Sequence, residues 1–83
     1  MTIRKERLTG GRDFYVDQFT AEAAQVAFST TYPFVAYSAL VFLNGVLQKK
    51  GTSYNEDGDL EGITFEADIV EEGDGVEVRY AKS

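Results

Sequence analysis

The acidic residues around position 60 have the types and spacing that come closest to a chemical site. Asp57, Asp59 and Glu61 occupy alternate positions, and Gly62 follows them directly. This pattern is typical of the D-x-[DN]-x-[DN]-G calcium loop, in which oxygen ligands surround a hard cation. The twelfth position of such a loop would be Asp68, which is shorter than the usual bidentate glutamate. We therefore regard these three acids as a calcium candidate and rank it below a solvated hairpin turn.

Other catalytic chemistry has little support in the composition. The chain contains neither cysteine nor histidine, which excludes disulfides and removes the commonest general base and the commonest transition-metal ligand. There are 14 acidic residues, but the sequence sets no two of them in an apolar cleft, as a shifted pKa would require. We expect a protein that is not an enzyme and has no cofactor.

Charge is distributed unevenly along the chain. Residues 1–12 contain four basic residues and Glu6, a balance of +3, whereas residues 13–83 contain thirteen acids and four basic residues, a balance of −9. The two parts sum to the net charge of −6. So acidic a body repels phosphates, and free nucleic acid is a poor partner. The N-terminal segment reads either as a solvated tail or as a basic arm that binds a partner, through Arg4, Lys5, Arg7 and Arg12.

The elements that would position any site are strands. Asn44-Gly45 lies between apolar runs and predicts a two-residue hairpin joining strands at 39–43 and 46–49. In the first strand Val41 and Leu43 share one face and Leu40 and Phe42 the other, so both faces need cover. Residues 63–66 and 76–80 alternate in the same way, with Val76, Val78 and Tyr80 expected to point inward.

The segment before the hairpin allows two interpretations. Thr20 followed by alanines and Glu22 could begin a helix. Alternation at Val26 and Phe28 instead favours a strand. We predict that residues 14–16 open a short strand or an anchoring segment, followed by a turn at 21–24 and a strand at 25–30.

These elements predict an all-β fold, a small antiparallel β-sandwich or open barrel at 13–83 preceded by an extended basic N-terminal arm at 1–12. No run approaches the roughly 18 apolar residues that span a bilayer, so we expect no membrane partner. A chain of 83 residues is near the small end of what folds alone, and self-association is then a common source of stability. We expect a homo-oligomer, with a trimer as one arrangement.

The order of the segments resembles a small β-module of tailed-bacteriophage virion proteins, present in tail fibres and head-associated proteins. The resemblance covers residues 18–80 and consists of the segments 18–21 and 25–28, the 40–48 hairpin, a Tyr54 step, the 62–65 strand and the closing 73–80 strand. The chain departs from that pattern at Ser53, where aspartate is usual, and in its longer acidic turn at 55–62. The module has no catalytic residues, so none are carried over.

The resemblance implies a virion structural protein that assembles in the host cytoplasm with other capsid or tail proteins. We favour a capsid decoration or cement protein that docks on the shell through its N-terminal arm. The alternative is a tail, neck or fibre-base component. We rank lower a carbohydrate-binding module that uses Tyr32 and Tyr37, and an inhibitor that mimics nucleic acid through the acids Glu56, Asp57, Asp59, Glu61, Asp68, Glu71, Glu72 and Asp74.

Overall fold

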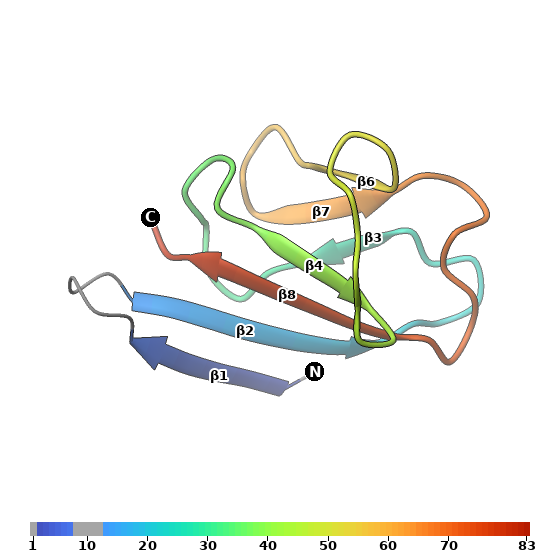
Figure 1. Ribbon diagram of the computed structural model, residues 1–83, viewed down its shortest axis with the longest axis horizontal. Helices are drawn as coiled ribbons and strands as arrows, with labels where there is room; N and C mark the ends of the chain where they lie inside the picture. The colour runs from blue at the N-terminus through green and yellow to red at the C-terminus, as the bar shows by residue number, and fades with distance from the viewer. Residues whose placement is uncertain (1, 8–12) are drawn as a thin grey trace.

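The computed structural model describes the backbone of residues 2–7 and 13 and the whole of residues 14–83. Within those ranges the regular structure is entirely β-strand (Figure 1). No helix there has the length and apolar character needed to cross a membrane. The strands are β1 (Thr2–Arg7), β2 (Asp13–Thr20), β3 (Ala27–Ser29), β4 (Leu40–Leu43), β5 (Val46–Leu47), β6 (Tyr54–Glu56), β7 (Gly62–Phe65) and β8 (Gly75–Ala81).

Two antiparallel sheets form a small sandwich. The larger sheet has the order β1-β2-β8-β4-β5, and the smaller has the order β3-β7-β6. Figure 1 shows the smaller sheet lying across one face of the larger one. The predicted all-β antiparallel fold is confirmed, and β8 occupies the centre of the larger sheet.

The core lies between the sheets, where alternate residues of β8 meet the smaller sheet. Val76, Val78 and Tyr80 are at most 1% exposed, as the alternation predicts. They share one buried cluster with Phe28, Ile63, Phe65 and Tyr54 from the opposite sheet. Their burial is the main stabilising term, at about 25 cal/mol per Å² of apolar surface.

The predicted hairpin is confirmed at Asn44-Gly45, where the φ angles are 50° and 85°. Both residues adopt the left-handed conformation that a type I′ turn requires. The asparagine has a second role, because its Oδ1 accepts a hydrogen bond from the Gly75 amide at 2.8 Å and its Nδ2 donates to Asp74 at 3.1 Å. The turn is thereby fastened to the start of β8.

The segment from Asp17 to Thr20 differs from the prediction. Strand β2 continues to Thr20, since seven consecutive residues pair with β8, from Phe14 with Ala81 to Thr20 with Gly75. The predicted turn is present at residues 23–24, and β3 lies inside the range predicted for its strand. The helical alternative beginning at Thr20 is wrong, because cross-sheet pairing outweighs the helix propensity of the alanines.

The backbone of the predicted arm is paired over part of its length. Residues 2–7 form β1, an edge strand that runs antiparallel to β2 with Thr2 opposite Gln18 and Arg7 opposite Asp13. Met1 and residues 8–12, and with them Arg12, lie outside the described residues. The basic segment therefore contributes a strand to the larger sheet.

Candidate docking surface

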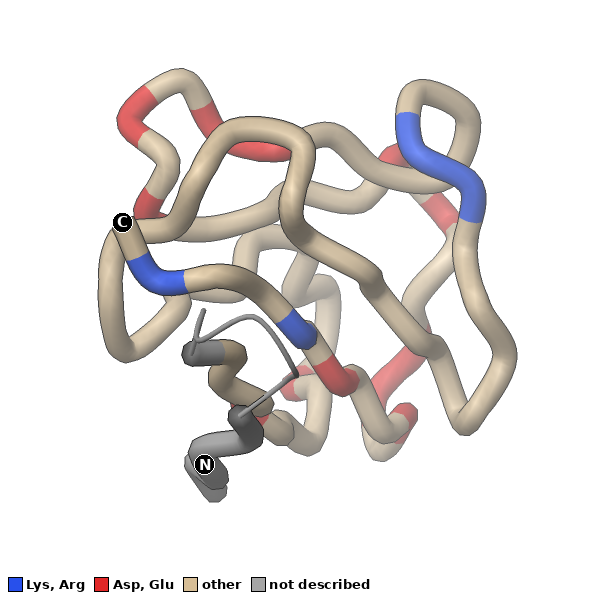
Figure 2. Tube along the Cα trace, turned by 60° about the vertical axis from the view of Figure 1, so that its left-hand side comes forward, with Lys and Arg blue, Asp and Glu red and all other residues tan. Residues whose placement is uncertain are grey.

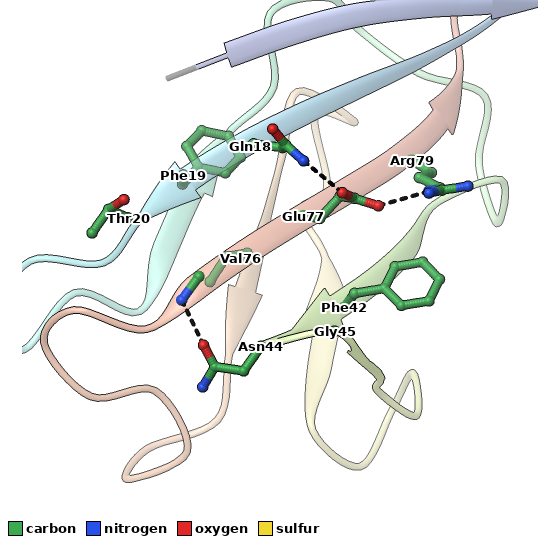
Figure 3. A pocket seen from close by; sticks show the side chains of 10 residues that line it. Gln18, Phe19, Thr20, Phe42, Asn44, Gly45, Val76, Glu77 and Arg79 are labelled. Carbon is green, nitrogen blue, oxygen red and sulfur yellow. Dashed lines mark hydrogen bonds and ion pairs between the residues drawn. The ribbon is translucent and has the colours of Figure 1, made fainter.

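The outward face of the larger sheet contains a groove of about 590 Å³ (Figure 3). It crosses the ends of three strands, β2, β4 and β8, and includes the hairpin turn. Its lining residues are Gln18, Phe19, Thr20, Phe42, Asn44, Gly45, Gly75, Val76, Glu77 and Arg79. Volumes of this order accommodate small ligands or a few side chains of a partner.

A network centred on Glu77 orders the polar side chains of the groove. The Glu77 carboxylate accepts a hydrogen bond from Gln18 Nε2 at 2.8 Å and from Arg79 Nε at 2.7 Å (Figure 3). The Arg79 guanidinium lies over the Phe42 ring, 5.4 Å from its centroid. The groove therefore has fixed polar groups and one aromatic face that is stacked with a cation.

Beside the groove, the β4–β5 hairpin exposes large apolar side chains. Leu40 is 48% exposed, Leu47 55% and Val46 65%. The sequence pattern predicted that both faces of β4 need cover, and the smaller sheet covers only the face carrying Val41. Leu40 and Leu47 lie on the outward face with Phe42, whereas Val46 is paired with Leu43 on the other face. Exposed apolar side chains such as Leu40 and Leu47 mark contact surfaces in soluble proteins.

The calcium candidate is not assembled in the described residues. Asp57 Oδ1 accepts a hydrogen bond from Thr64 Oγ1 at 2.7 Å, and Asp59 Oδ1 accepts one from the Glu61 amide at 3.0 Å. No group of three or more acidic side chains among residues 14–83 could hold a metal ion. Gly62 is explained by packing instead, since a Cβ there would lie 2.8 Å from the Phe28 carbonyl oxygen and from Asp57 Oδ2.

Two other acids of the proposed nucleic-acid mimic accept hydrogen bonds that stabilise turns. Glu56 accepts hydrogen bonds from the amides of Tyr37 and Ala39 at 2.7 and 3.2 Å. Asp74 accepts them from the Glu71 amide and from Asn44, and these bonds lower the pKa of the Asp74 carboxyl. These carboxylates fix the conformation of the chain around them.

The two tyrosines considered for carbohydrate binding have different surroundings. Tyr32 is half-buried and packs on Tyr15, with ring centroids 4.7 Å apart, and Lys82 Nζ lies 4.9 Å from its ring. Tyr37 is 81% exposed and carries Lys50 Nζ at 3.9 Å from its ring centroid. Each tyrosine ring contacts a different lysine, and the two rings do not form one continuous binding surface.

Asp17 is a buried acid that sequence reasoning did not single out. Its side chain is fully buried, and Oδ2 accepts hydrogen bonds from the Thr31 amide at 2.6 Å and the Tyr80 hydroxyl at 3.0 Å. Burial, followed by the nearby Asp17 carboxylate, raises the pKa of Tyr80. The partners of Asp17 are distant in the chain, so the sequence gives little indication that it is buried. The one local signal is an acidic residue within a strand that otherwise alternates.

The proposed partner-binding residues Arg4, Lys5 and Arg7 belong to β1, so they lie along one edge of the larger sheet. Comparison of the chain with protein-family models, with curated proteins and with solved structures found no match. An ordered groove next to exposed apolar side chains is suited to binding another macromolecule.

Proposed function

We propose that the chain is a bacteriophage virion structural protein, a capsid decoration or cement protein that docks on the shell. The observation that carries this proposal is the exposure of Leu40, Val46 and Leu47 on a hairpin that is fastened to β8. Such side chains contribute binding energy once a partner covers them. The resemblance in segment order to virion β-modules supplies the class of partner.

The basic edge strand supplies the second support for docking. Arg4, Lys5 and Arg7 follow one another closely in β1, whereas the rest of the chain is strongly acidic. Local positive charge on an acidic protein steers it towards an acidic partner surface and fixes its orientation there. We propose that this strand faces the shell and that the sandwich projects outward, so that the exposed hairpin, at the opposite edge of the larger sheet, contacts a neighbouring virion protein.

The experiment removes the positive charges of the N-terminal segment while keeping strand β1. The variant R4Q/K5Q/R7Q/R12Q retains the chain length and backbone of β1, and the matched control K82Q removes a charge elsewhere. Purified particles lacking the protein are incubated with each variant, and bound copies per particle are counted. We expect the quadruple variant to bind at least about tenfold more weakly, since several charge pairs of about 0.5 kcal/mol each are lost.

Unchanged occupancy of the quadruple variant would overturn the proposed role of the basic strand. The position of gold-labelled protein on the particle separates the two virion roles. Label over the shell supports decoration, whereas label confined to the tail or neck supports the tail, neck or fibre-base alternative.

A further inference from the structure

Tyr37 combines an unfavourable backbone conformation with an exposed side chain. Its φ is 66°, a region that large L-residues rarely adopt, and its side chain is 81% exposed. Leu60 also has a positive φ, of 58°, but its side chain packs against the core. The other such residues are small or have short polar side chains: Ala24, Asn44 and Asp68. Among the described residues, Tyr37 is the one large residue that has a positive φ and an exposed side chain.

The surrounding structure holds this conformation in place. Glu56 binds the Tyr37 and Ala39 amides with both carboxylate oxygens, and the Ser38 amide closes the turn on the Val35 carbonyl at 3.0 Å. Ala81 of β8 anchors both ends of the turn, since its carbonyl accepts from the Val35 amide and its amide donates to Ser38 Oγ. The backbone that carries the ring is thus held in one conformation before any partner arrives, which reduces the entropy lost on binding.

Two lysines lie at the same corner of the molecule, beside the hydrogen-bonded carboxylate of Glu56. Lys50 Nζ lies 3.9 Å from the Tyr37 ring centroid, and Lys49 precedes it. Figure 2 shows this adjacent pair of basic residues on one loop. We call Tyr37 and Lys50 the knob.

The groove on the outward face has the complementary properties. Phe42 contributes an aromatic ring beneath the Arg79 guanidinium, whereas Phe19 packs on Phe28 and Val76 points into the core, so these two residues line the groove chiefly through their backbone. The groove volume of about 590 Å³ exceeds that of one tyrosine ring. Asp74 is hydrogen-bonded to the lining residue Asn44, and its carboxyl is ionised at neutral pH. The groove therefore offers one aromatic side chain with a negative charge beside it.

We propose that the knob of one copy of this chain inserts into the groove of a second copy, with Lys50 facing Asp74. The knob precedes β4 and the groove residues Asn44 and Gly45 follow it, so the two features lie at opposite ends of that strand. Two copies can exchange knobs reciprocally in a two-fold dimer, or they can join head to tail and close into a ring, of which a trimer is one form. This inference does not depend on the virion role.

Two single variants test the interface from either side. Tyr37→Gly removes the ring and also relieves the positive φ, so the urea midpoint of the folded chain should not fall. Thr20→Arg adds bulk and positive charge at an exposed position of the groove. Sedimentation velocity should show concentration-dependent assembly of the wild type and a dissociation constant at least about 30-fold higher for each variant. Val26→Ser, which alters an exposed apolar residue elsewhere, serves as the control and should assemble like the wild type.

Mixing the two variants gives the decisive measurement. The T20R chain keeps its knob and the Y37G chain keeps its groove, so an equimolar mixture should form a 1:1 dimer that cannot extend. A wild type that stays monomeric up to its solubility limit would overturn the proposal. Assembly of Y37G alone at wild-type strength, or a mixture that remains monomeric, would overturn it as well. The particle-binding experiment with R4Q/K5Q/R7Q/R12Q is scored separately, so failure of one proposal leaves the other to be judged by its own result.

Discussion

The buried carboxylate of Asp17 joins three segments that are far apart in the chain. It lies in β2, and its Oδ2 accepts hydrogen bonds from the Thr31 amide and from the Tyr80 hydroxyl of β8. Removing one partner of a buried hydrogen-bonded group leaves the others desolvated and unpaired, which is more destabilising than the loss of an exposed contact.

Asp17→Ala should therefore lower the free energy of unfolding by about 2–4 kcal/mol, since the buried Tyr80 hydroxyl and the partly buried Thr31 amide lose their acceptor. Urea denaturation followed by tyrosine fluorescence measures the change. The exposed acid Glu72 provides the control, and Glu72→Ala should stay within about 0.5 kcal/mol of the wild type. A D17A variant as stable as E72A would contradict the role given to the buried carboxylate.

Tyr80 makes the free energy of unfolding depend on pH in the alkaline range. Because burial and Asp17 raise its pKa above the ordinary value of 10.0, the phenol stays protonated in the folded chain while the unfolded chain begins to ionise. The unfolded state then binds fewer protons, so the free energy of unfolding falls as the pH rises above about 10. Tyr54, whose pKa burial also raises, adds to this fall.

Tyr80→Phe should lower stability near neutral pH by about 1–2 kcal/mol, because a buried hydrogen bond is lost. The difference from the wild type should narrow between about pH 9 and pH 11, since phenylalanine does not ionise. Urea titrations across that range provide the measurement. Parallel pH profiles for the two proteins would show that Tyr80 ionises equally readily in both states.

At the scale of elements, the Asn44-Gly45 hairpin allows the cost of a left-handed backbone conformation to be measured by itself. Gly45 has a φ of 85°, and no atom lies within 4 Å of a Cβ built on it. Gly45→Ala should therefore destabilise through conformation alone, by about 1–2 kcal/mol. Gly58 also has open space but no positive φ, and Gly58→Ala should be neutral or slightly stabilising. Equal urea midpoints for the two variants would contradict the left-handed turn.

Strands with local signals could be predicted from the sequence, and strands defined by distant pairing could not. The Asn-Gly turn and the alternation in β7 and β8 are readable within a few residues. Strand β2 was predicted too short, because Asp17 and Gln18 look polar unless their partners Tyr80 and Glu77 are known. The same reason hides the groove, whose lining comes from three strands that meet only in the fold. The positive φ of Tyr37 has no sequence signal either, since glycine or asparagine is expected there.

At the scale of the whole molecule, β1 closes one side of the larger sheet. Its six residues pair with β2 along most of that strand's length. Deleting residues 1–7 should lower the free energy of unfolding by about 2–4 kcal/mol, because several net-favourable backbone hydrogen bonds are lost. It should also promote aggregation, since the long edge of β2 becomes available to other chains.

The quadruple glutamine variant is the matched control for this deletion, since it keeps the strand and changes only its charge. We expect its free energy of unfolding to stay within about 1 kcal/mol of the wild type. Thermal unfolding and light scattering of both proteins provide the measurement. A deletion as stable and as soluble as the glutamine variant would show that β1 contributes nothing to the sheet.

The pairing of Phe14 with Ala81 has a consequence for synthesis on the ribosome. Strand β2 emerges early, but its main partner β8 is among the last segments of this stretch to be translated. Until then the nascent β2 can only form a hairpin with β1, and its other edge stays open to non-native contacts. Slowing of elongation, or loss of the chaperones that shield new chains, should therefore harm the yield of this protein more than that of a helical protein of similar length.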